Sequence, residues 1–305
     1  MPKVLDPPPK SPTKPATGPA ARRAGFAPIA APAGMSRDAS PPPADPAPVR
    51  PSARPVPPFV PPDRGPGARV LTPADLPAAA ELLTRLFGPV PLDRVVWDPF
   101  PGTATLEDCE RFNEAGHLCE LVDGVLLEKA VGFIESVIAM RLGGKVHQWD
   151  PDERRGRRTG ADGFVELRPG RTRGPDYSFF LHRRFPGGAV PPNSRGSVKV
   201  PAVTPDFVVE VLSESNTREE IDGKLDDLFA AGTQLAWVLD PGARTARVVT
   251  PAPAVEGDDD ARPWAETTVG EDVTLAGDPV LPGFSVPLAE LLDGPPAPAG
   301  SETAE

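Results

Sequence analysis

Two acidic residues lie in segments that otherwise have the apolar character of buried strands. Asp176 is near the start of the run 175–180, and Glu210 lies within the run 206–212. Burying a carboxylate among apolar side chains is costly unless a partner compensates its charge. When two such acids converge, a bound divalent cation is the expected compensation. Lys224 follows downstream and completes a set of residue types typical of nucleases.

The strand containing Glu210 is expected to direct this side chain toward one end of a sheet. Because side chains alternate along a strand, Glu210 shares a face with Val208 and Leu212. It lies near the carboxyl end of the strand, where ligand sites of open sheets are commonly found. Asp176 follows Gly174-Pro175 and also lies near a strand end.

Lys224 is predicted to lie on a helix over 216–232, with Asn216 as its N-cap and Gly232 as its C-cap. It flanks the apolar stripe of that helix. Since the helix directly follows the strand of Glu210, we expect it to pack on the sheet so that Lys224 reaches the strand ends.

Mg²⁺ or Mn²⁺ is the cofactor that such a site indicates. Mg²⁺ is commonly bound by one or two carboxylates, several waters and a substrate phosphate. A bound metal lowers the pKa of a water and offsets charge on the attacked phosphate. In this hypothesis, Lys224 orients the water or stabilises the developing negative charge.

Structural interpretations compete for each residue. Asp176 could cap a turn after Gly174-Pro175, and Glu210 could pair with an arginine on a neighbouring strand. Lys224 could extend along the sheet with its ammonium in water. The order of Asp, Glu and Lys on strand, strand and helix favours the metal site over these alternatives taken one at a time.

The remaining patterns predict a mixed α/β sheet with helices against it. The segment 118–128 should form a hairpin, because Asp123-Gly124 lies between two apolar runs. Helices are expected from Thr72 to Phe87, with Thr72 as N-cap, and from Thr105 to just before Gly116. The other predicted elements are a helix over 133–147 and strands over 163–168, 235–239 and 246–250.

Composition separates the N-terminal segment from the rest. Residues 1–70 contain 21 of the 45 prolines and carry a net charge of about +6, against about −17 for the remainder. Such a segment cannot bury enough apolar surface to order itself, so we expect a disordered tail that acts as a spacer or a docking arm. The acidic remainder argues against a protein that simply coats nucleic acid.

The cysteine and hydropathy patterns bear on location. Cys109 and Cys119 have no metal-ligand spacing, and no apolar run is long enough to span a membrane. We therefore expect a cytoplasmic protein without a membrane segment.

Several motifs resemble those of the restriction-endonuclease-like Uma-two family, within the PD-(D/E)XK nuclease superfamily. The resemblance covers residues 92–293 and continues through Lys224 to the closing 280–284 segment. It is based on the segments 119–124, 161–163, 174–179, 204–213 and 231–241.

The resemblance implies a restriction-endonuclease-like domain over 92–293, preceded by a helical extension over 71–91 and followed by a disordered tail over 294–305. It also implies that Asp176 and Glu210 bind Mg²⁺ and that the substrate is DNA. Leu212 stands where the superfamily has its signature lysine, and Lys224 matches the helical lysine that is thought to replace it. Glu135 and Glu120 are candidates for an additional acid, with Glu135 favoured because the superfamily often has an acid on its first core helix.

Two functions follow from these observations. The first is a metal-dependent DNA endonuclease that uses Asp176, Glu210 and Lys224. The alternative is a catalytically inactive nuclease fold that acts in protein or nucleic-acid interaction. The sequence leaves the oligomeric state open, with a homodimer as the candidate assembly because two-fold dimers are common and suit cleavage of both strands.

Overall fold

The structure is a computed structural model that describes residues 75–130, 132–188, 200–253 and 261–294. The predicted disordered tails over 1–70 and 294–305 lie outside the described residues, apart from Gly294. The predicted N-cap Thr72 also lies outside them.

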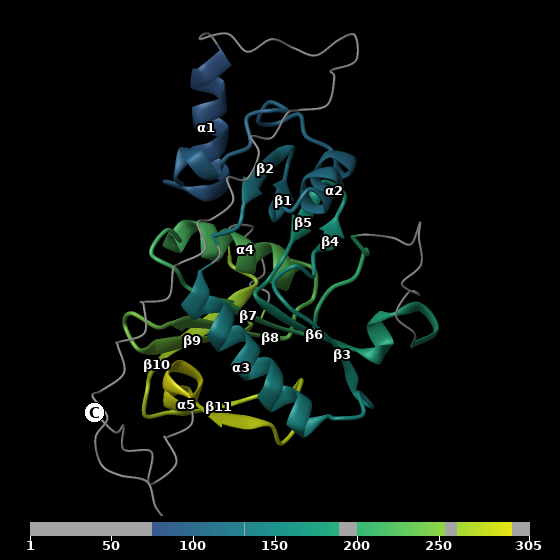
Figure 1. The fold of residues 1–305 in the computed structure, drawn as a ribbon, viewed down its shortest axis with the longest axis vertical. Coiled ribbons are helices and arrows are strands. Elements are labelled where there is room, and N and C mark those ends of the chain that lie inside the picture. Colours follow the sequence, from purple (N-terminus) through teal and green to yellow (C-terminus); the bar gives the residue numbers. More distant parts are fainter. Residues whose placement is uncertain (1–74, 131, 189–199, 254–260, 295–305) are drawn as a thin grey trace, which may run out of the picture. The chain divides into compact units, whose positions relative to one another are not determined.

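The larger sheet has six strands in the order β10-β9-β8-β7-β6-β3 (Figure 1). Only the pair of β7 and β8 is parallel, and the other neighbouring pairs are antiparallel. The predicted mixed α/β architecture is therefore confirmed. The strands are β3 (Gly156–Thr159), β6 (Tyr177–Leu181), β7 (Phe207–Val211), β8 (Leu235–Asp240), β9 (Thr245–Pro251) and β10 (Trp264–Gly270).

Helices cover both faces of this sheet. On one face, α4 (Arg218–Ala230) packs its Leu225 and Leu228 against Val208 of β7. On the other face lie α3 (Phe133–Trp149), α5 (Leu288–Asp293) and the small sheet of β11 (Thr274–Ala276) and β12 (Ser285–Pro287). Both faces of β7 are thus buried, which explains its nearly continuous apolar sequence.

A second sheet has the strand order β2-β1-β5-β4. Its strands are β1 (Cys119–Val122), β2 (Val125–Glu128), β4 (Val165–Arg168) and β5 (Arg171–Arg173). Side chains of α1 (Leu76–Phe87) and α2 (Leu106–Glu114) pack against β1 and β2 in two separate apolar clusters. Short 3₁₀ turns span Leu92–Arg94, His182–Arg184 and Pro186–Gly188. The chain passes from β5 to β6, and so from the second sheet to the first, through Gly174 and Pro175.

Capping chemistry explains where the helices begin. Thr105 forms a capping box with Asp108 at α2, as the sequence predicted. At α4 the predicted N-cap Asn216 is wrong by one residue, because Thr217 accepts the hydrogen bond from the Glu220 amide. The Asn216 carboxamide instead accepts from the amide of Ser213 in the preceding turn.

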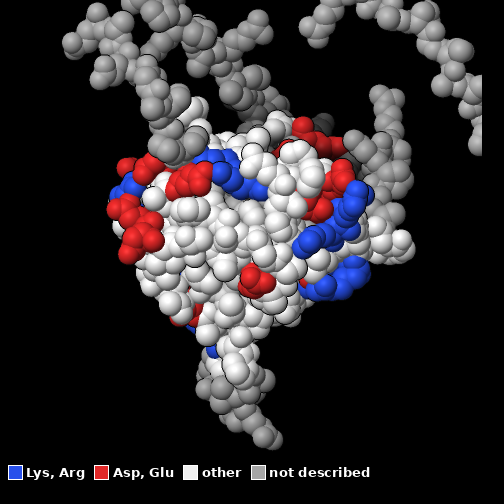
Figure 2. Space-filling view, turned by 90° about the horizontal axis from the view of Figure 1, so that it is seen from below, with Lys and Arg blue, Asp and Glu red and all other residues white. Residues whose placement is uncertain are grey.

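Charged side chains are unevenly spread over the molecule. Figure 2, which views the molecule from below relative to Figure 1, shows Lys and Arg in separate groups near the margins, with Asp and Glu beside them. Uncharged residues occupy the middle of this face. A continuous basic surface for the phosphate backbone is not found on this face. None of the described helices combines the length and the apolar composition that crossing a membrane requires.

The tight β1–β2 turn yields a prediction about glycine. Gly124 has φ +81°, and a Cβ there would lie 2.5 Å from the Gly102 carbonyl carbon. Gly170 has a similar φ of +76° but open space around it. Gly170→Ala should therefore cost only the backbone strain, about 1–2 kcal/mol. Gly124→Ala should cost about 1–3 kcal/mol more because of the collision. Urea unfolding of both variants measures the difference, and equal losses would contradict this packing.

Candidate active site

Asp176 and Glu210 lie on the same face of the larger sheet. Tyr177 of β6 pairs with Val209 of β7 in antiparallel register, so the next position outward sets Asp176 opposite Glu210. Side chains directly opposite in such a pair have Cβ atoms about 5 Å apart. The face is the one that α4 covers, because Val208, two residues from Glu210, packs against that helix. The condition for a shared cation, two acids on one side of the sheet, is met.

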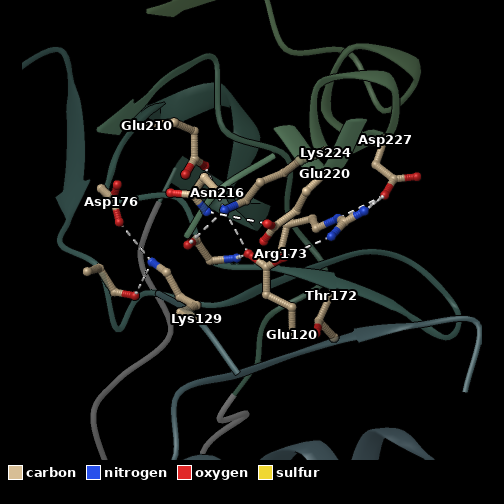
Figure 3. Close-up of polar contacts among 12 residues, drawn as sticks. Glu120, Lys129, Thr172, Arg173, Asp176, Glu210, Asn216, Glu220, Lys224 and Asp227 are labelled. Carbon is tan, nitrogen blue, oxygen red and sulfur yellow. Dashed lines mark hydrogen bonds and ion pairs between the residues drawn. The ribbon is translucent and has the colours of Figure 1, made fainter. Parts of the chain in front are cut away.

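Lys224 of α4 contributes its ammonium to the same place. Its Nζ lies 2.8 Å from Glu210 Oε1 and 2.8 Å from Glu120 Oε1 (Figure 3). The side chain is buried, so it does not reach into water as the alternative interpretation required. Burial alone would lower the pKa of Lys224, but Glu120 and Glu210, together with Asp176, raise it above its usual range. Lys224 is therefore a permanent cation at neutral pH.

Glu120 comes from β1 of the second sheet and holds Lys224 from the other side. Its Oε2 accepts from Arg173 at 2.8 Å, and its Oε1 accepts from the Gly174 amide at 3.0 Å. Arg173 in turn donates to Asp227 of α4. Burial by itself would raise the pKa of Glu120, yet Lys224 and Arg173 lower it to about 2. With these partners, Glu120 acts as a support for Lys224.

Glu210 has fewer compensating contacts than Glu120. Its Oε1 is buried without a hydrogen-bond donor, because the nearby Lys224 ammonium forms an ion pair with it outside hydrogen-bonding geometry. Burial raises the pKa of Glu210 to about 7; Lys224 and Lys129 oppose this rise, and Asp176 and Glu120 add to it. The arginine pairing considered for Glu210 is not found among the described residues.

Asp176 has both carboxylate oxygens engaged. Oδ2 accepts from the Val211 amide at 2.8 Å, and Oδ1 lies 3.1 Å from Lys129 Nζ. The first contact ties the start of β6 to β7, so Asp176 does more than cap the turn at Gly174-Pro175. Lys129, directly after β2, was not identified in the sequence. The one available signal was its place at the end of a predicted hairpin strand, where direction of the side chain cannot be read.

Glu135, the favoured additional acid, lies apart from Glu120. It is in the first turn of α3 and lines a second pocket that also includes Asp176 and Tyr177. Glu120 instead lines the pocket shared by Asp176, Glu210 and Lys224. The structure thus places the two additional candidates in two pockets that meet at Asp176.

The residues present fit a divalent cation. Two carboxylates converge, and one buried carboxylate oxygen has no hydrogen-bond donor, a state that a metal ligand would relieve. No group of three or more His, Cys, Asp and Glu side chains arranged to hold a metal occurs in the part of the chain that the structure describes. A site with two carboxylates suits Mg²⁺ or Mn²⁺, which complete their shell with water and phosphate oxygens.

Comparisons with known proteins agree with the fold. A family model described as "Uma2: Putative restriction endonuclease" matches residues 105–289. A crystal structure of "a putative nuclease belonging to DUF820" from Anabaena variabilis ATCC 29413 aligns with a TM-score of 0.50 and 18% identity. The alignment covers 62% of this chain and 97% of that one. A search of curated proteins gives no match.

Glu210→Gln should stabilise the metal-free protein at alkaline pH. The folded-state pKa of Glu210 is about 7, above the ordinary 4.5. Between these values the folded protein retains a proton that the unfolded chain releases, so stability falls as pH rises through this window. The neutral amide should recover up to about 3 kcal/mol at pH 8 and flatten the pH dependence between 5 and 8. Urea unfolding across this range measures both effects, with the exposed Glu214→Gln as control. A loss of stability at pH 8 would contradict the assignment.

Glu120→Gln should have the opposite effect, although both glutamates contact the same ammonium. The pKa of Glu120 is depressed to about 2, so its contribution is complete above pH 4.5 and disappears as pH falls toward 2. Removing one partner of buried ion pairs costs about 3–5 kcal/mol. Urea unfolding at pH 7 should show this loss, and the difference from wild type should shrink at pH 3. A neutral effect at pH 7 would mean that Glu120 does not support Lys224.

Proposed function

Because this chain belongs to the Uma2 family, whose description is a restriction endonuclease, we propose that it is a metal-dependent DNA endonuclease. The observation that carries the proposal is the contact of Lys224 Nζ with Glu210 Oε1 at 2.8 Å, with Asp176 opposite Glu210 on the same face. Mg²⁺ or Mn²⁺ is the proposed cofactor, and Asp176 and Glu210 are its proposed ligands.

The proposed cation would lower the pKa of an attacking water and offset the charge of the phosphate. Lys224 supplies a second positive charge beside the phosphate. Because its pKa is raised, it acts as a hydrogen-bond donor and charge stabiliser, and it does not act as a base. Its contribution to rate depends on meeting charge that is greater in the transition state than in the ground state.

Glu120 and Arg173 have a positioning role in this proposal. The ion pair of Glu120 with Lys224 fixes the ammonium beside Glu210, and Arg173 holds the second oxygen of Glu120. Fixed charges that need no rearrangement during the reaction are the most effective ones for catalysis. The buried network therefore supports an active enzyme better than it supports the alternative of an inactive nuclease fold.

The pocket that these residues line also contains polar groups from α4 and its preceding turn, including Asn216 and Glu220. Arg94 closes one side through two contacts with Glu220, at 2.9 and 2.6 Å. Arg94 is thus neutralised within the protein, which leaves Lys129 and Lys224 as the lysines that line the pocket. A phosphodiester is the ligand class that suits two lysines beside a cation.

Plasmid cleavage tests the proposal. The purified full chain should cut supercoiled DNA with Mg²⁺ or Mn²⁺ and lose this activity with EDTA, recovering when excess metal returns. Asp176→Asn, Glu210→Gln and Lys224→Met should each reduce the rate at least about a hundredfold, since each removes a group acting at the reacting phosphate.

Glu214→Gln, an exposed residue outside the pocket, should cut at the wild-type rate. Circular dichroism should show that each variant is folded. Absence of cleavage by the wild type on supercoiled, linear and single-stranded DNA with both metals would favour the inactive interaction module.

A further inference from the structure

Lys129 is a buried cation that the proposed mechanism does not use. Its side chain is 5% exposed, and its Nζ lies 3.1 Å from Asp176 Oδ1 and 3.1 Å from the Ala161 carbonyl oxygen. In Figure 3 it extends toward Asp176 on the side of the site away from Arg173 and Asp227. The ammonium thus has two fixed acceptors and lines the same pocket as Glu210 and Lys224.

The contacts of Asp176 decide which oxygen is left for a cation. Oδ2 accepts from the Val211 amide within the sheet, where it is part of the link between β6 and β7. Oδ1 is the oxygen free of backbone contacts, and Lys129 Nζ lies against it. A divalent ion at Oδ1 would lie within a few ångströms of this ammonium, and two positive charges at that range repel strongly in a buried site.

We propose that Lys129 is a resident cation that occupies the metal-binding oxygen of Asp176 until a divalent ion displaces it. This inference rests on the proposed function, because it assumes that Asp176 is a metal ligand. In the metal-free protein, the ammonium neutralises a carboxylate that would otherwise be buried beside Glu210. Loading the metal then costs the Lys129–Asp176 ion pair, so Lys129 weakens metal affinity while it stabilises the empty site.

The same arrangement separates Lys129 from Lys224 in role. Lys224 is held between two acids, so loss of one contact leaves it paired with Glu120. Lys129 has one carboxylate partner and one neutral carbonyl acceptor. Of these two lysines, Lys129 is therefore the one whose displacement leaves the remaining network intact.

Mn²⁺ titration by calorimetry tests the inference on the full chain. Lys129→Met should bind Mn²⁺ about tenfold more tightly than wild type, because no ammonium has to be displaced. Its metal-free Tm should be lower than that of wild type, since Asp176 loses its partner. Saturating Mn²⁺ should raise its Tm by more than it raises that of wild type.

Two further variants make the result specific. Lys145→Met removes a lysine of α3 that pairs with Glu290 of α5, away from the pocket, and should leave Mn²⁺ affinity unchanged. Lys129→Gln keeps a hydrogen-bond donor but has no charge, so it should also bind Mn²⁺ more tightly. If the Met variant does not fold, the Gln variant decides the matter.

The outcomes separate this inference from the proposed function. Mn²⁺ binding by wild type with equal or weaker binding by the folded Lys129 variants overturns the displacement and leaves the metal site standing. Binding by the variants alone supports displacement in its strongest form. No binding by wild type or variants overturns both this inference and the metal-dependent mechanism.

Discussion

The buried ion pairs of Lys224 connect every part of the candidate site. Its ammonium lies between Glu210 of the larger sheet and Glu120 of the smaller one, and Lys224 itself belongs to the helix that covers the larger sheet. An isolated charge in this position would be very costly, and the two carboxylates make it tolerable. The local arrangement of charge therefore requires that both sheets and α4 are assembled together.

The sequence was sufficient for those parts of the fold that depend on local chemistry. The Asp123-Gly124 hairpin, the capped helix at Thr105 and the mixed α/β sheet are all present. Where local signals competed, the prediction was wrong: Asn216 and Thr217 are both good N-cap residues, and the helix begins after the second. Strand alternation also placed Glu210 with Val208 toward α4, as the structure shows.

The charge network could not be derived in the same way. Glu120, Lys129 and Arg173 are brought to the site by pairing between strands that are distant in sequence, and no period in the sequence specifies such pairing. The arginines near Asp176 had two interpretations, contacts with phosphate or a solvated basic face, and Arg173 fits neither. It is buried and satisfied by Glu120 and Asp227. Its partners became visible only once β5 was placed beside β1.

The passage from β5 to β6 has a mechanical consequence. At Gly174 the backbone amide donates to Glu120, and the backbone carbonyl lies 3.5 Å from Lys224 Nζ. The hinge between the two sheets is thus gripped on both sides by the charged groups it positions. Sliding one sheet past the other would lengthen these contacts before it disturbed any strand pairing. A long polymer that wedges between the sheets would consequently retune the ammonium through the main chain, without touching it.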